Sequence, residues 1–189
     1  NPIRTEMVAP NWGIIFNICS DHEGNVLVVS SKGLMLISRR GISRTLFAPE
    51  GATPTACVSE GNGDWLISAY GTYRLHAGKV SEVADSAEAL GHAMLMRNLG
   101  GSDILSYQAL SALTVRRQGR ISKIWQGRGI PVGFIKTVVP IPGGLLIGGE
   151  HGLARYDGAR FATIDDRAHP FLANVTGILP RADGSTWLI

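Results

Sequence analysis

The sequence predicts an all-β fold of repeated antiparallel sheets, and three observations lead to it. A short apolar strand, a glycine turn and a second strand return along the chain around five anchor residues: Leu27, Trp65, Ile104, Leu146 and Trp187. The anchors follow one another at 38, 39, 42 and 41 residues, close to the period of about 40–45 residues of a propeller blade. Glycine makes up 24 of 189 residues, about twice its usual share of roughly 7%. Together they predict a partial β-propeller of about 4.5 to 5 four-stranded antiparallel blades.

The repeats divide the chain as one continuous array, which we interpret as a single partial propeller domain over residues 1–189. The expected repeats are residues 14–50, 51–89, 90–131, 132–171 and an incomplete 172–189. Each repeat has enough sequence for four strands. The third is the least regular, because Leu110 or Ser111 stands where the glycine before the third strand is expected.

The strands are placed from the anchors outward, since apolar runs bounded by glycine are typical of strands. The expected first strands are residues 16–20, 55–59, 93–97, 135–139 and 175–179. The second strand carries the anchor, the third follows the glycine six residues later, and a glycine turn leads to the fourth. Tight turns of this kind join neighbouring antiparallel strands.

The array is expected to be a piece of a larger one. Four full units are followed by the first two strands of a fifth, and residues 1–10 could be the outer strand of a preceding blade. Open terminal blades expose apolar faces and unpaired edges. We therefore expect a fragment of a longer protein that forms homo-oligomers through its open blades.

Composition excludes several classes of function. The formal charge is +3 and the pI is about 9.1, with no long basic run, so no nucleic-acid partner is expected. The longest apolar stretches fall well short of the roughly 18 residues of a membrane span. A membrane association is expected only through segments outside this sequence.

The two cysteines stand at the same place in two repeats. Cys19 and Cys57 each precede their anchor by eight residues, and the same offset gives Met96, Val138 and Leu179 in the other repeats. The position is apolar, and free cysteine behaves as a small buried hydrophobe. Equivalent sites on neighbouring blades are expected to lie farther apart than the roughly 7 Å Cα limit of a disulfide. Buried thiols are therefore expected, with a bridge or a reactive thiol as the alternatives.

Local motifs for catalysis or cofactor binding are missing from the sequence. The five histidines are scattered and no two have the spacing of metal ligands, and there is no Gly-x-Ser-x-Gly segment. The glycine-rich pieces precede strands, whereas phosphate-binding loops follow a strand and open a helix. We predict no catalytic residues, no metal and no cofactor.

Candidate ligand-binding residues come from the loops. The segments between repeats cross to the innermost strand of the next blade, so they share one rim of the channel with the turns between second and third strands. Expected rim residues are Lys32, Tyr70, Arg128, His151, Asp165, Asp166 and His169. A solvated loop is the alternative for each. At the opposite end, the turns between third and fourth strands carry Arg40, Lys79, Arg120 and Arg160, either a basic edge for an acidic partner or solubilising charge.

The repeat resembles that of a known family. Residues 183–189 read Asp-Gly-Ser-Thr-Trp-Leu-Ile, and residues 148–161 read Gly-Gly-Glu-His-Gly-Leu-Ala-Arg-Tyr-Asp-Gly-Ala-Arg-Phe. Both are similar to the two-component regulator propeller repeat, which runs approximately D-G-N-x-W-I-G-T-x-x-G-L-x-R-Y-D-G-x-x-F. The match is good in the fourth repeat, clear in the fifth, partial in the first two and poor in the third.

The resemblance implies an extracytoplasmic sensor region of a bacterial membrane receptor, periplasmic or extracellular, with a histidine kinase, diguanylate cyclase or DNA-binding output domain elsewhere. Such a module would bind a small molecule or glycan and would not itself be an enzyme. A protein-interaction scaffold is the first alternative. A propeller lyase or lactonase is the second, and the scattered histidines disfavour it because such an enzyme needs ligands that converge on a metal.

Overall fold

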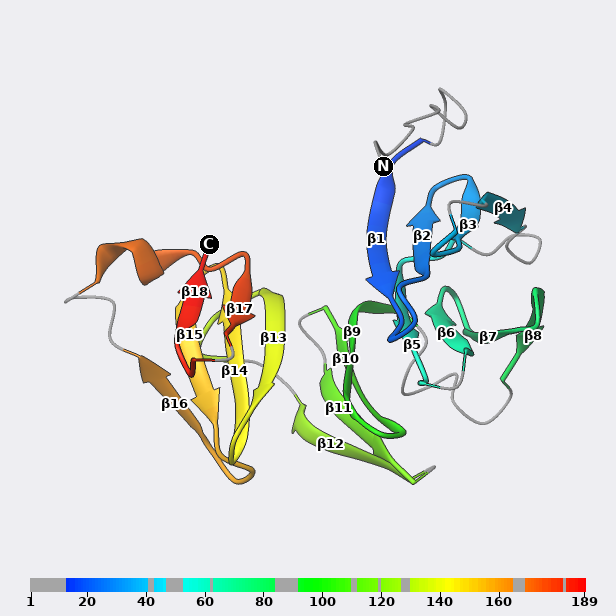
Figure 1. The fold of residues 1–189 in the computed structure, drawn as a ribbon. Coiled ribbons are helices and arrows are strands. Elements are labelled where there is room, and N and C mark those ends of the chain that lie inside the picture. The colour runs from blue at the N-terminus through cyan, green and yellow to red at the C-terminus, as the bar shows by residue number, and fades with distance from the viewer. Residues whose placement is uncertain are drawn as a thin grey trace, which may run out of the picture. The chain divides into compact units, whose positions relative to one another are not determined.

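The structure is a computed structural model of the chain. It describes residues 13–40, 43–46, 53–61, 63–83, 92–109, 112–118, 120–126, 130–164, 169–181 and 183–189. Each of the first four repeats forms a four-stranded antiparallel sheet with its strands in chain order, and two strands of a fifth sheet follow (Figure 1). The predicted all-β class and the four-stranded blades are confirmed. The chain divides into two compact units, Asn1–His92 and Ala93–Ile189.

Unit one contains the first two blades. Blade one consists of β1 (Ile15–Ser20), β2 (Val26–Ser30), β3 (Gly33–Ile37) and β4 (Ser43–Leu46). Blade two consists of β5 (Ala56–Ser59), β6 (Trp65–Ser68), β7 (Thr72–His76) and β8 (Lys79–Glu82). The central strands β2 and β6 are almost wholly buried. That explains why their sequences are continuous apolar runs and not alternating ones.

The two blades of unit one pack face to face, with the first strands β1 and β5 side by side. Their shared core joins the anchors Leu27 and Trp65 to Val29, Leu34 and Ile67. The predicted anchor positions are therefore the centre of the core, and both anchors are fully enclosed.

Unit two contains blades three and four and the start of a fifth. Blade three consists of β9 (Ala93–Gly100), β10 (Asp103–Gln108), β11 (Ala112–Arg117) and β12 (Arg120–Gln126). Blade four consists of β13 (Ile135–Ile141), β14 (Gly144–Gly149), β15 (Gly152–Tyr156) and β16 (Phe161–Ile164). The short 3-10 helix η2 (Pro170–Ala173) then precedes β17 (Ile178–Pro180) and β18 (Thr186–Leu188).

Two apolar clusters hold unit two together. The larger lies between blades three and four and includes Leu105, Tyr107, Val138 and Ile147. The smaller joins blade four to the last two strands through Leu146, Leu172 and Ile178, among others. Within unit two, each sheet thus covers a face of its neighbour, as the repeat predicted.

One predicted strand has different bounds in the structure, and two other predictions concern residues that the structure does not describe. The fifth first strand was expected at residues 175–179, but β17 spans Ile178–Pro180. Val175 instead donates its backbone N–H to the Gly149 carbonyl at 3.0 Å, so this part of the expected strand anchors the crossing segment to the preceding blade. Leu110, Ser111 and residues 1–10 lie outside the described residues.

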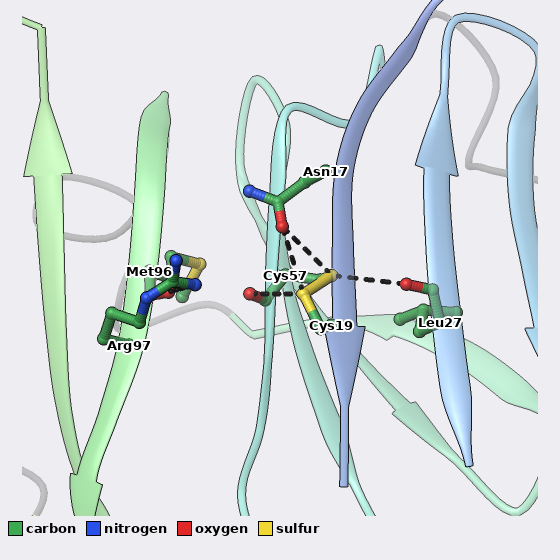
Figure 2. The surroundings of a disulfide bond; sticks show 6 residues. All are labelled: Asn17, Cys19, Leu27, Cys57, Met96 and Arg97. Carbon is green, nitrogen blue, oxygen red and sulfur yellow. Dashed lines mark hydrogen bonds between the residues drawn. A yellow bond between two sulfur atoms is a disulfide. The ribbon is translucent and has the colours of Figure 1, made fainter. Parts of the chain in front are cut away.

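The prediction of two free, buried thiols is wrong. Cys19 on β1 and Cys57 on β5 form a disulfide, with their Cα atoms 6.1 Å apart (Figure 2). Both residues are buried, as expected. The separation was overestimated because blades diverge from the inside outward, and the first strands of two neighbouring blades remain close enough for a bridge.

Candidate functional site

The candidate site is the rim of each unit, meaning the turns between second and third strands together with the segments that lead into the first strands. In blade one the Ser31 N–H donates to the Ile14 carbonyl at 2.8 Å, and the Ile14 N–H donates to Ser31 Oγ at 3.0 Å. Gly13 has a φ of 71°, and a Cβ there would collide with the Ser31 side chain. The turn therefore lies directly on the leading segment, and it presents Lys32 as an exposed side chain.

Blade two carries an aromatic pair on its rim. The Tyr70 and His92 rings meet edge to face with centroids 5.2 Å apart, and Tyr70 is 69% exposed. The His92 N–H donates to the Ala69 carbonyl at 2.9 Å. His92 has a φ of 59°, a left-handed conformation that few residues with a side chain adopt. The backbone bond and the ring contact together hold the imidazole beside the tyrosine.

In blade four the same arrangement places His151. Its N–H donates to the Val132 carbonyl at 2.9 Å, and its ring lies where a side chain on Gly133 would be. Gly149 makes the approach of the two segments possible, since a Cβ there would lie 2.5 Å from the carbonyl oxygens of both Val132 and Phe134. The turn of blade four, like that of blade one, is thus fixed to its leading segment through glycine.

A second ring pair stands at the start of the fifth repeat. The His169 and Phe171 rings are 5.6 Å apart, and Phe171 is 69% exposed. The Leu172 N–H donates to the His169 carbonyl at 2.8 Å, and Leu172 is buried against blade four. The short helix η2 is therefore anchored by Leu172 while Phe171 projects outward.

A lysine links the first strand of blade four to the segment that leads into β17. Lys136 on β13 donates from Nζ to Asn174 Oδ1 at 3.0 Å. Asn174 belongs to the segment that leads into β17. The contact places a cation beside the crossing segment that also carries His169 and Phe171.

Four of the seven predicted rim residues lie within the described part of the chain. Lys32, Tyr70 and His151 occupy turns between second and third strands, and His169 precedes η2, whereas Arg128, Asp165 and Asp166 lie outside the described residues. In the described part of unit one Tyr70 contacts His92 and not Lys32, and in the described part of unit two His169 contacts Phe171 and not His151. Sequence reasoning missed His92 and Phe171. Phe171 left a signal in the sequence, because it is an aromatic residue in a segment between two repeats.

The opposite ends of the blades carry the predicted basic residues. Arg40, Lys79, Arg120 and Arg160 are all exposed at turns between third and fourth strands. Arg160 has an acidic neighbour, since its Nε lies 3.7 Å from Asp157 Oδ2. The backbone N–H groups of Arg160 and Ala159 both donate to the Asp157 carboxylate and lower its pKa. Asp157 therefore orders its turn as an anion.

The described parts of the two rims combine exposed aromatic rings with imidazole groups. Within the described ranges, no three His, Cys, Asp or Glu side chains are grouped so that they could hold a metal ion. Exposed aromatic rings offer flat apolar faces, and the adjoining imidazoles offer hydrogen bonds. None of the described helices has the length and apolar character to cross a membrane.

Comparisons with known proteins identify the fold. No family model and no curated protein matches the chain in sequence. Among solved structures, it is similar to the extracellular domain of the putative hybrid two-component system BT4673 from Bacteroides thetaiotaomicron, with 16% identity and a TM-score of 0.72 over 96% of this chain and 26% of that one. The extracellular domain of BT3049 from the same organism gives 14% identity and a TM-score of 0.66 over 97% and 27%.

A lyase shares the same fold. Virginiamycin B lyase from Staphylococcus aureus gives 12% identity and a TM-score of 0.68 over 93% of this chain and 62% of the lyase.

The chain spans about a quarter of the length of the two-component extracellular domains. At the level of the fold, these structures bear out the resemblance to the two-component regulator propeller, and the chain has the β-propeller fold.

Proposed function

We propose that this chain is part of the extracytoplasmic sensor region of a bacterial signal-transduction receptor and that it binds its ligand without catalysis. The observation that carries the proposal is the fold shared with the extracellular domains of putative two-component systems along nearly the whole chain. The chain spans about a quarter of those domains. We therefore also propose that the full protein contains further propeller blades and an output domain.

The disulfide supports an extracytoplasmic location. Disulfides persist in the periplasm and outside the cell, whereas cytosolic thiols are kept reduced. The Cys19–Cys57 bridge is buried in the core between two blades, so it has a structural position and not that of an exposed redox thiol. A protein that depends on such a bridge folds in an oxidising compartment.

The rim supports binding of a small molecule or glycan. Tyr70 and Phe171 expose large ring faces beside His92 and His169. Exposed aromatic rings of this kind stack on the apolar faces of sugar rings and other flat ligands, while imidazole nitrogens bind hydroxyl groups. We propose that each unit contacts ligand through its own rim: Tyr70, His92 and Lys32 in unit one, and His169, Phe171 and His151 in unit two. Arg128, Asp165 and Asp166 are proposed to take part from the crossing segments.

A lyase is the second candidate, because virginiamycin B lyase has the same fold. One fold carries many functions, and the site must decide between them. The described rim is made of exposed rings and single cations, which favours recognition over metal-assisted chemistry. A binding assay that also measures turnover of the added compound separates the two candidates.

The experiment measures binding of neutral oligosaccharides to the full 189-residue chain by calorimetry and by retention of the intact sugar. We expect saturable binding at the rim of each unit, which Tyr70→Ala weakens about tenfold in unit one and Phe171→Ala weakens about tenfold in unit two, since stacked rings contribute roughly 1–3 kcal/mol. Ile164→Ala is the matched control, because Ile164 is an exposed apolar residue on the outer strand β16. Binding that neither rim substitution affects contradicts the proposed site, and release of a cleaved product contradicts the non-catalytic role.

A further inference from the structure

Unit two contains a cavity at the ends of its blades away from the rim. It has a volume of about 270 Å³ and lies between blades three and four, beside the turn that joins β13 to β14. Leu99, Val115 and Ile124 of blade three line one side. Ile141, Leu145 and Tyr156 of blade four line the other. The cavity continues the apolar core between the two blades to the surface.

The walls of the cavity combine apolar side chains with polar groups, and the hydroxyl groups on them have partners. Tyr156 donates its phenolic O–H to the Gly158 carbonyl at 2.8 Å. Ser122 donates from Oγ to the Val115 carbonyl at 3.3 Å. An occupant therefore meets aliphatic side chains and one aromatic ring as well as polar groups of the wall.

One lining residue is charged. Arg117 at the end of β11 forms an ion pair from Nε to Asp103 Oδ2 at 3.1 Å, and its side chain is 69% exposed. A guanidinium has five N–H donors, so this pair leaves others for an anion. Arg120 lies opposite Arg117 in the hairpin that joins β11 to β12, whereas the side chain of Arg116 points to the other face of the sheet. Arg117 and Arg120 outnumber the Asp103 carboxylate, so the surface beside the cavity has a net positive charge.

We propose that this cavity binds a small amphiphilic carboxylate, with its apolar body between blades three and four and its carboxylate paired with Arg117. The volume lies just below the usual range of roughly 300–1,000 Å³ for ligand sites, which limits the body to about one ring with a short chain. A carboxylate matches the fork of Arg117. This second site is independent of the rim and goes beyond the sensor function.

The test uses 3-phenylpropionate and 3-phenylpropionamide, which have nearly the same size and differ in charge. Binding to the full chain is followed at 0.15 M salt by NMR shifts of the Gly144 and Gly158 amides, both of which line the cavity. We expect saturable shifts with the acid and about tenfold weaker binding of the amide. Arg117→Gln should weaken binding of the acid about tenfold and leave binding of the amide unchanged.

Two further variants make the result specific. Ile124→Phe should fill the cavity and abolish the shifts for both compounds. Arg120→Gln is the matched control, because Arg120 is the cross-strand neighbour of Arg117 but does not line the cavity, and it should change binding less than twofold. Equal affinity for acid and amide overturns the proposal, as does an absence of saturable shifts. An effect of Arg120→Gln as large as that of Arg117→Gln overturns it too.

Discussion

Cys19 and Cys57 hold the same position in two successive repeats and join the first strands of two neighbouring blades through a disulfide. Asn17 lies beside the bridge, with Oδ1 3.3 Å from Cys19 Sγ (Figure 2). The bridge spans 38 residues of sequence, and it ties blade one to blade two at the inner edge of their shared core.

Removal of the bridge should destabilise unit one. A disulfide that closes a loop of this length restricts the unfolded chain, and its loss typically costs about 2–4 kcal/mol. We expect Cys19→Ala, Cys57→Ala and the double variant to show similar decreases in the free energy of unfolding in urea, because either substitution removes the whole bond. Alkylation of the denatured, unreduced chain should label no cysteine. Labelling of both thiols would contradict the bridge.

Gly149 should tolerate no side chain. In Gly149→Ala the new methyl group would lie 2.5 Å from two backbone carbonyl oxygens, so the leading segment of blade four must shift at a cost of about 1–3 kcal/mol. Gly71→Ala is the matched control, because its nearest contact is the flexible Glu82 side chain at 3.4 Å. Urea unfolding of both variants measures the difference. Equal stability of the two would show that the rim is not held together as described.

Acid should lower the free energy of unfolding by protonating Asp157 and Asp183, which stabilise their turns as carboxylates. The pKa of Asp157 is lowered by the backbone N–H groups of Arg160 and Ala159, and that of Asp183 by the Ser185 hydroxyl and backbone N–H. Because both folded pKa values lie below the ordinary 3.8, the unfolded chain binds more protons in this range. The contribution of the two carboxylates to the free energy of unfolding is therefore complete above the ordinary pKa. It is lost as the pH falls through their lowered folded-state pKa values.

The effect should be small, since both carboxylates are exposed. Urea unfolding at a series of pH values from neutral to about 2 measures it. Asp157→Asn and Asp183→Asn should each flatten the acid side of the stability curve. A curve that keeps the parent slope in the double variant would contradict the assignment.

The chain should associate with itself through its open blade faces. Ile18 on β1 is 59% exposed, whereas the equivalent residues Ala56, Leu95, Thr137 and Ile178 of the other repeats are at most 8% exposed. Trp187 is likewise exposed at an anchor position that is buried in every other repeat. Apolar faces of this kind are normally covered.

Sedimentation velocity over a range of concentrations tests this association. We expect oligomers that Ile18→Lys reduces and Tyr70→Lys leaves in place, because Tyr70 is exposed on the rim and away from the open face of blade one. A parent chain that stays monomeric at high concentration would contradict the prediction.

Most of the fold could be predicted from the sequence, because each blade repeats the same apolar and glycine positions. The anchors Leu27, Trp65, Ile104 and Leu146 are all buried on second strands. The disulfide was missed because the distance between blades is a property of their packing and no local pattern reports it. The fifth first strand was misplaced because Val175 bonds to Gly149, a contact between distant segments.

The candidate site could be predicted only by position. The position of Lys32, Tyr70 and His151 in turns between second and third strands predicted that they lie on the rim. The partners of the exposed rings, however, depend on where the crossing segments lie. His92 sits beside Tyr70 because its backbone takes a left-handed conformation, which sequence alone does not report for histidine. Phe171 projects because Leu172 anchors η2.

The sensor function is tested most directly by sequencing the encoding gene on both sides of this segment. The account predicts further Asp-Gly-x-x-Trp repeats in the same reading frame, a membrane helix after them and a kinase, cyclase or DNA-binding domain. A stop codon soon after Ile189 with no such domain upstream would contradict it and would leave a small self-associating binding protein.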